Sequence, residues 1–169
     1  MKMVLIQIIG AIGILIKIIS IEQKEKKDIL SYQGVAFIII SLQYYLLGAY
    51  TPASLNASTS LRSFIFYNYS KNNKAIPIFW LFIFLFITLL LGVITWSGFL
   101  GLIPVINTTM YVVSSWLKDA KWLRVFYVIA ALLFMCYNFN VGAYAMLVGN
   151  LFEVITGTHS IFRFDKRKK

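Results

Sequence analysis

Apolar residues occur along this chain in long blocks, and short polar segments separate one block from the next. A block of about twenty apolar residues is long enough to cross the hydrocarbon core of a bilayer as a helix. Seven spans fit the pattern, with approximate ranges 3–21, 29–47, 51–67, 76–96, 100–117, 125–137 and 141–161. The pattern therefore predicts an all-α integral membrane protein with seven transmembrane helices.

The third span, 51–67, is the least apolar because it is rich in Ser, Thr and Ala, but the charge distribution favours counting it. With seven spans, the connections 22–28, 68–75 and 118–124 and the C-terminal tail fall on one side of the membrane. These segments hold nearly all Lys and Arg residues. Positive charge marks the cytoplasmic side, so we expect the N-terminus outside and the C-terminus in the cytoplasm. The third span would pack closely against other helices.

A short pattern occurs twice in the chain. Gly48-Ala49-Tyr50 is followed by Asn56, and Gly142-Ala143-Tyr144 is followed by Asn150, with each matching pair 94 residues apart. An internal repeat in a membrane chain points to its fold and to its binding site. Coincidence in an aromatic-rich chain is the alternative.

The repeat divides the seven spans as three, one and three. A first three-helix bundle would occupy residues 1–70, a linker helix residues 71–97, and a second bundle with a basic tail residues 98–169. A single intervening helix makes the two bundles parallel, related by an axis along the membrane normal.

The ends of the second and sixth spans carry matching aromatic and glycine residues, in Tyr45-Leu46-Leu47-Gly48 and in Phe139 to Gly142. With the Asn pair and the seven-span topology, they resemble the SWEET and PQ-loop superfamily of small transporters. The proline–glutamine dipeptide of the PQ-loop group is absent. Such proteins carry a proline in the first helix of each half, and here only the second of these is present, as Pro104. The resemblance therefore implies the architecture and not a sugar substrate.

Further segments, spread over most of the chain, are similar to the YgjV family of bacterial inner-membrane proteins. They are Gln43 to Gly48 with Tyr50, Leu55-Asn56-Ala57, Leu102-Ile103-Pro104-Val105-Ile106, Tyr137-Asn138-Phe139 and Ile161-Phe162-Arg163-Phe164. This resemblance implies a location in the bacterial inner membrane and a fold. It implies no activity, because the proteins of that family have no assigned activity.

Composition supports the membrane class and removes other classes of function. Of the 169 residues, 60% are hydrophobic and 13% charged, where a soluble domain carries about 25% charged residues. The net charge of +10 lies in short loops and the tail, where orientation signals lie, so we expect lipid and no nucleic acid as partner. Cys136 is the sole cysteine, and His159 stands alone near the end of the last span, with no Cys or second His beside it to complete a metal site. We expect no metal and no cofactor.

Asn56 and Asn150 are the strongest candidates for a binding site. They occupy equivalent places on the third and seventh spans, so the two-fold axis would bring them face to face across a central cavity. A side-chain amide offers two donors and two acceptor lone pairs, which suits a neutral or zwitterionic solute. The alternative is that each amide only joins neighbouring helices. Tyr50 and Tyr144 begin the same helices and are weaker candidates, because aromatic residues anchor helices at the interface.

Glu153 is an acidic residue well inside a span, and it shares a helix face with Asn150 three residues earlier. An intramembrane ionisable residue is by default a functional candidate. Glu153 would take up a proton coupled to transport, counter a substrate cation, or form a structural ion pair. Arg62 is the expected partner in the last case, because the repeat places it one turn deeper than Glu153 across the axis.

Asn107 and Pro104, both on the fifth span, form a weaker candidate pair. Asn107 would add to the binding site. Pro104 frees a backbone carbonyl and, with Gly48 and Gly142, is the candidate hinge; a fixed kink is the alternative.

These features predict a transporter or facilitator of a small polar solute, held between two parallel three-helix bundles. The alternative is a membrane scaffold, sensor or partner subunit in which the Asn residues only pack helices. An enzyme is not expected, since one His and one acid inside a span leave no Ser–His pair and no metal-ligand spacing.

Overall fold

The computed structural model describes residues 2–96 and 98–165, so the last four residues of the predicted basic tail lie outside the described part. The described residues form α1 (Lys2–Ile21), α2 (Lys26–Leu46), α3 (Tyr50–Lys71), α4 (Ile78–Ile94), α5 (Leu102–Trp116), α6 (Ala120–Asn140) and α7 (Tyr144–Ser160). A 3-10 turn, η1 (Phe99–Gly101), precedes α5, and a π-helical turn, η2 (Ile161–Asp165), follows α7.

The prediction of an all-helical chain with seven helices is confirmed within the described residues. Four helical stretches there are long and apolar enough to cross a membrane: α1, α2, η1 with α5, and α6. Helix α4 is apolar but has only 17 residues. The membrane class therefore stands on both the sequence and the structure.

Helix α6 is longer than the predicted span 125–137. Its first turns carry charged residues that the prediction assigned to the preceding connection. Arg124 is 1% exposed, and its guanidinium donates hydrogen bonds to Asp165 at 2.8 Å and to the carbonyl of Gln23 at 2.8 Å. An arginine with such partners does not need to end a helix. The connection before α6 is correspondingly short and covers residues 117–119.

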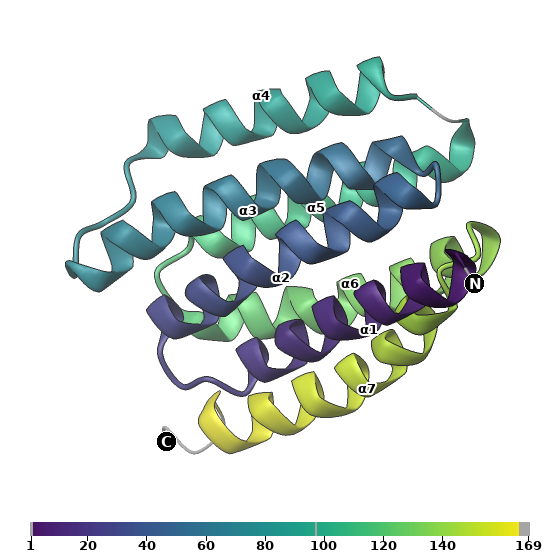
Figure 1. The fold of residues 1–169 in the computed structure, drawn as a ribbon. Coiled ribbons are helices and arrows are strands. Elements are labelled where there is room, and N and C mark those ends of the chain that lie inside the picture. The colour runs from purple at the N-terminus through teal and green to yellow at the C-terminus, as the bar shows by residue number, and fades with distance from the viewer. Residues whose placement is uncertain (1, 97, 166–169) are drawn as a thin grey trace.

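Six of the helices form a closed ring. Following the contacts, α1 packs on α2, α2 on α3, α3 on α5, α5 on α6, α6 on α7, and α7 again on α1. Helix α4 lies outside the ring against α3 and α5, at the top of Figure 1. Its buried residues are only Phe84, Thr88 and Gly92, so most of its surface is left for lipid.

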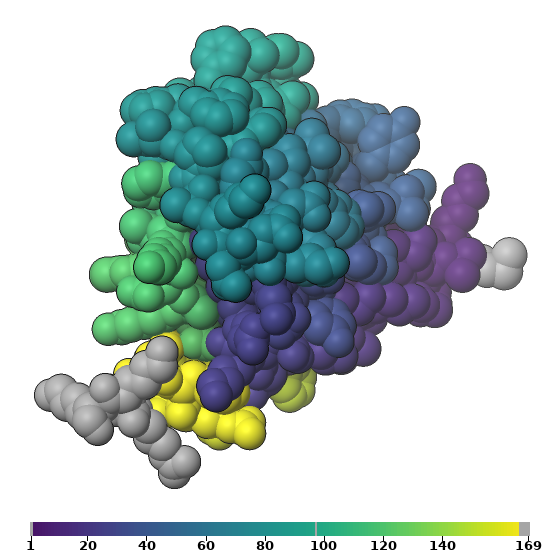
Figure 2. Space-filling view, turned by 90° about the vertical axis from the view of Figure 1, so that its left-hand side faces the viewer, coloured from purple at the N-terminus to yellow at the C-terminus, as the bar shows by residue number. Residues whose placement is uncertain are grey.

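The connections alternate between the two ends of the ring. The connections 22–25, 72–77 and 117–119 lie at one end together with the end of α7, and Lys2 at the start of α1 lies at the other (Figure 1). Figure 2 looks onto the first of these ends. All Lys and Arg residues of the connections lie there, and we call it the basic end.

The turns at the opposite end after α2 and α6 are built alike. Gly48 and Gly142 have φ angles of +76° and +71°, a left-handed conformation that favours glycine. The N–H of Ala49 donates to the carbonyl of Tyr44 at 2.9 Å, and the matching bond in the second turn is 3.0 Å long. Both turns are Schellman motifs that end a helix, while the hinge role of these glycines stays a prediction.

Helix α3, the least apolar, is packed against α2, α4 and α5. The hydroxyl of Ser60 donates to the carbonyl of Gly34 in α2 at 2.7 Å, and Thr59 and Ser63 donate to carbonyls of their own helix at 2.8 Å. A Cβ on Gly34 would lie 2.8 Å from the ring of Phe64, so glycine is required for this approach. These three buried hydroxyl groups of α3 are thus satisfied inside the helix pack.

Candidate functional site

The ring encloses a small cavity near its middle, which we call the central cavity. It is lined by Lys17, Phe37, Ile40, Tyr44, Asn56, Thr59, Thr108, Tyr111, Phe134, Met146 and Asn150, which come from all six ring helices. Its volume is about 20 Å³, which is room for about one water molecule. The cavity is therefore narrow, and its lining is of mixed polar and aromatic character.

Asn56 and Asn150 both line this cavity, as the repeat predicts. The side-chain nitrogen of Asn56 donates to the carbonyl of Pro52 in its own helix at 2.7 Å. Asn150 is 1% exposed, and its side-chain nitrogen has no hydrogen-bond partner among the described residues. A buried donor without a partner costs roughly 1–3 kcal/mol, so a guest that accepts a hydrogen bond from Asn150 would be favoured.

Glu153 forms an ion pair, and its partner is Lys17 in α1. The Lys17 amine lies 2.8 Å from one carboxylate oxygen and 3.1 Å from the other. The prediction that Arg62 pairs with Glu153 is wrong: Arg62 lies on α3, which faces α7 across the ring, whereas α1 is in contact with α7. The ion pair is buried, with the side chains 8% and 0% exposed, so Lys17 does not extend towards the lipid headgroups.

Three aromatic rings surround the Lys17 amine. The distances from Nζ to the ring centres are 5.9 Å for Phe37, 5.8 Å for Tyr111 and 5.0 Å for Tyr127. These are cation–π distances, and the Tyr127 hydroxyl also donates to the Lys17 carbonyl at 3.2 Å. Lys17 is a candidate site residue that the sequence analysis did not propose, because it pairs with Glu153 and lines the central cavity. The signal was its place as a lysine inside an apolar span, opposite in charge to the acid inside another.

Arg62 is a second buried cation of the interior, and it is fully buried. None of its three guanidinium nitrogens has a hydrogen-bond partner among the described residues. Lys17, Arg62 and Glu153 together leave one excess positive charge in the interior of the ring. This arrangement favours a guest with a carbonyl, carboxylate or other acceptor group.

The remaining candidates lie away from the central cavity as it is described. Asn107 donates to the carbonyl of Ala130 in α6 at 3.4 Å, a packing contact between α5 and α6. Pro104 lies in the first turn of α5, where a missing N–H costs little, and its role as a hinge stays a prediction. Tyr50 and Tyr144 are 59% and 56% exposed at the starts of α3 and α7.

No group of three His, Cys, Asp or Glu side chains in the described part of the chain is placed to hold a metal ion. Cys136 is exposed and free. The polar side chains that line the central cavity offer hydrogen bonding and charge through amide, hydroxyl and amine groups.

Comparison with known protein families agrees with the resemblance to the YgjV family and gives no support to the one with the SWEET and PQ-loop superfamily. Residues 4–168 match the Imp-YgjV family, which is described as bacterial inner membrane protein. The match covers nearly the whole chain, and the chain therefore belongs to this family and is located in the bacterial inner membrane. No curated protein and no solved structure matches it.

Proposed function

We propose that this inner membrane protein is a transporter or facilitator of a small polar solute, which binds in the central cavity. The observation that carries the proposal is the meeting of Asn56 and Asn150, from α3 and α7, at one cavity inside the ring. Polar groups are costly to bury in a membrane interior, and where they converge there they often mark a solute pathway. The unpartnered amide of Asn150 would bind the solute directly.

The lining of the cavity supports an internal repeat. Three pairs of lining residues are each 94 positions apart: Lys17 with Tyr111, Ile40 with Phe134, and Asn56 with Asn150. The hydroxyl of Tyr44 also donates to the side-chain oxygen of Asn138 at 2.5 Å, and these two residues differ by 94 as well. Equivalent residues of two halves meet only near the axis that relates them, so this axis would pass through the cavity.

The order of helices in the ring fits the same proposal. We name α1–α3 the first half and α5–α7 the second half. Contacts within the first half recur in the second, since α1 packs on α2 as α5 does on α6, and α2 on α3 as α6 does on α7. Helix α4 has no counterpart and would be the linker of a 3+1+3 arrangement like that of SWEET transporters. The basic end would face the cytoplasm.

The two halves meet along two seams, α1 with α7 and α3 with α5. Rocking of the halves about these seams would open the cavity to one end or the other, as alternating access requires. The volume of about 20 Å³ then belongs to a closed state without solute. The Lys17–Glu153 ion pair crosses the α1–α7 seam and would have to rearrange when this seam opens.

Cysteine accessibility tests the proposal. Cys136→Ser provides a background without thiols, into which Asn56→Cys is introduced. A membrane-impermeant thiol reagent is then applied to inside-out and to right-side-out vesicles. Transport predicts that Asn56→Cys reacts from both sides. The matched control is Ser60→Cys, which is one turn away but faces α2 and should react from neither side.

The small volume of the cavity favours a second reading, in which the Asn residues pack helices in a scaffold, sensor or partner subunit. Under this reading Asn56→Cys stays unreactive from at least one side. Reaction from neither side, together with lower thermal stability of Asn56→Ala and Asn150→Ala than of the exposed control Asn140→Ala, would reject transport.

A further inference from the structure

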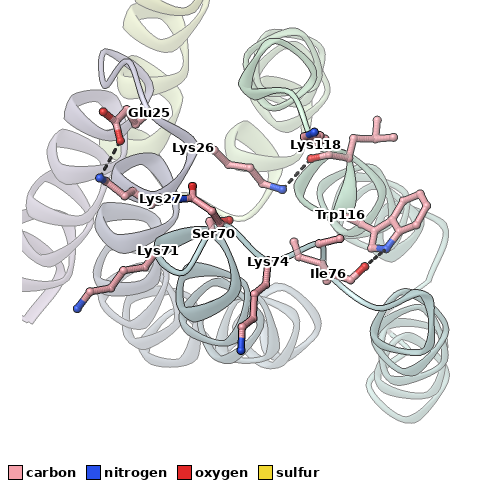
Figure 3. A pocket seen from close by; sticks show the side chains of 12 residues that line it. Glu25, Lys26, Lys27, Ser70, Lys71, Lys74, Ile76, Trp116 and Lys118 are labelled. Carbon is pink, nitrogen blue, oxygen red and sulfur yellow. Dashed lines mark hydrogen bonds and ion pairs between the residues drawn. The ribbon is translucent and has the colours of Figure 1, made fainter.

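A second and much wider cavity opens at the basic end, with a volume of about 920 Å³. Figure 3 shows that its walls come from three separate segments of the chain: residues 25–27, residues 70–76, and residues 116–118. These segments are the start of α2, the end of α3 with the connection to α4, and the end of α5. The cavity therefore lies where the two halves and α4 come together at the membrane surface.

Five lysines and a single acid line this cavity. The negative charge of the acid, Glu25, is already balanced by Lys27, whose amine lies 2.8 Å from the Glu25 carboxylate. This ion pair lowers the pKa of Glu25 below its ordinary value, chiefly through the hydrogen bond from Lys27, so the carboxylate stays charged. The four other lysines, Lys26, Lys71, Lys74 and Lys118, form no ion pair with a described carboxylate.

The amine of Lys26 is held at the cavity by a carbonyl. It donates to the carbonyl of Leu117 at 2.7 Å, which links the start of α2 to the end of α5 (Figure 3). The indole of Trp116 donates to the carbonyl of Ile76 at 3.0 Å and fixes the opposite wall. Trp116, Leu117 and Ile76 also give this wall an apolar surface next to the amines.

A groove on the same end provides an internal comparison. It has a volume of about 370 Å³ and is lined by three cations, Lys24, Lys121 and Arg124, and three acids, Glu25, Asp119 and Asp165. The rule that loops on the cytoplasmic side are positive accounts for lysines at this end. The rule does not account for the uneven distribution of acids between the two sites. The groove has equal numbers of cations and acids, whereas the wide cavity has four excess positive charges.

We infer that the wide cavity at the basic end binds a phosphate-bearing anion. Its unpaired amines suit phosphate oxygens, and its apolar wall beside them suits an amphiphile. Basic pockets between membrane helices near the surface bind anionic lipid headgroups in this way. The sources of such a group are an anionic phospholipid of the adjacent leaflet or a soluble phosphate compound. The inference goes beyond the proposed transport function and does not depend on it.

Native mass spectrometry of the full chain, released from a mild detergent, tests the inference. The probes are phosphatidylglycerol, zwitterionic phosphatidylcholine, and inorganic pyrophosphate. We compare the wild type with Lys74→Gln/Lys118→Gln, whose side chains line the cavity and are exposed. The matched control is Lys24→Gln/Lys121→Gln, which removes two charges from the same end but at the balanced groove.

The expected result is preferential binding of phosphatidylglycerol or pyrophosphate over phosphatidylcholine. The cavity variant should lose roughly tenfold or more in affinity, because each lysine near an anionic group contributes about a factor of five, while the control stays within about twofold. Binding of phosphatidylglycerol identifies a lipid site, and binding of pyrophosphate alone identifies a soluble ligand. Equal losses in both variants would show general surface charge and overturn the inference, as would no preference for either anion.

Discussion

The two seams between the halves differ in charge although they occupy equivalent places in the ring. The α1–α7 seam contains the Lys17–Glu153 ion pair. Towards the end opposite the basic end, Gln7 adds hydrogen bonds to the carbonyl of Gly142 at 2.8 Å and to the N–H of Ala145 at 2.9 Å. The α1–α7 seam is therefore joined by charge and by hydrogen bonds at two levels of the membrane.

The α3–α5 seam places different residues at the equivalent positions. Tyr111 stands where the first half has Lys17, and Thr59 stands where the second half has Glu153. Both line the central cavity. The cation next along α3, Arg62, has no hydrogen-bond partner among the described residues. If the halves rock, opening the α3–α5 seam separates no ion pair of this kind, whereas opening the α1–α7 seam does. Under the proposed repeat, positions that match in the two halves therefore carry side chains of different charge at the two seams.

The largest effect is expected at the ion pair. Glu153→Ala leaves the Lys17 amine buried without a counter-charge, and breaking a buried pair in this way costs about 3–5 kcal/mol. The equivalent change on the other seam, Thr59→Ala, removes a hydroxyl bonded to its own helix and should cost about 1 kcal/mol or less. The free energy of unfolding, from titration of the detergent-solubilised protein with a denaturing detergent, measures both.

A double change sharpens this prediction. Lys17→Met with Glu153→Leu removes both charges, and replacing a buried ion pair by apolar residues is often neutral. The double variant should therefore be more stable than Glu153→Ala. If the double variant loses as much stability as Lys17→Met and Glu153→Leu lose together as single changes, the two side chains are not coupled. The α1–α7 seam then does not depend on their charge.

The second largest effect is expected from close packing at the same seam. A Cβ on Gly149 of α7 would lie 2.2 Å from the Cγ1 atom of Ile14 in α1. Gly149→Ala should force the two helices apart and cost about 1–3 kcal/mol, as overpacking does. Ile14→Ala in the same chain makes room and should restore part of the loss. If the stability losses of Gly149→Ala and Ile14→Ala simply add in the double variant, measured in the same denaturation experiment, the two residues are not in direct contact.

The helices were predictable because a bilayer demands long apolar blocks and the turns carry glycine signals. The predicted span 3–21 and α1 differ by one residue at the start, while α6 gained eight residues over its predicted span. Five of the eight precede the predicted start, and they include Arg124, whose partner Asp165 is 41 positions further along the chain. A hydropathy pattern contains no information on such a distant partner, so it ends a span at a charged residue.

The meeting of Asn56 and Asn150 at one cavity was predictable from their 94-residue offset, whereas the partner of Glu153 was not. Offsets in the sequence bring Asn56 and Asn150 to one cavity, and the structure places both in its lining. The partner of Glu153 depends instead on which helix lies beside α7. Hydropathy does not specify which helices are neighbours, so the sequence alone does not identify a lysine of another span as the partner. The contact of α1 with α7 makes Lys17 the partner.

The smallest effect, and one of opposite sign, is expected from Arg62 on the α3–α5 seam. Its guanidinium is fully buried and has no partner among the described residues, and unsatisfied buried donors reduce stability. Arg62→Met keeps much of the apolar volume and removes these donors, so the free energy of unfolding should rise by about 1 kcal/mol. The same denaturation experiment measures it, with Arg124→Met as the matched control, because Arg124 is bonded to Asp165 and its loss should destabilise. A lower stability of Arg62→Met would mean that an acceptor satisfies Arg62 in the membrane, and the two seams would then be alike in holding a compensated cation.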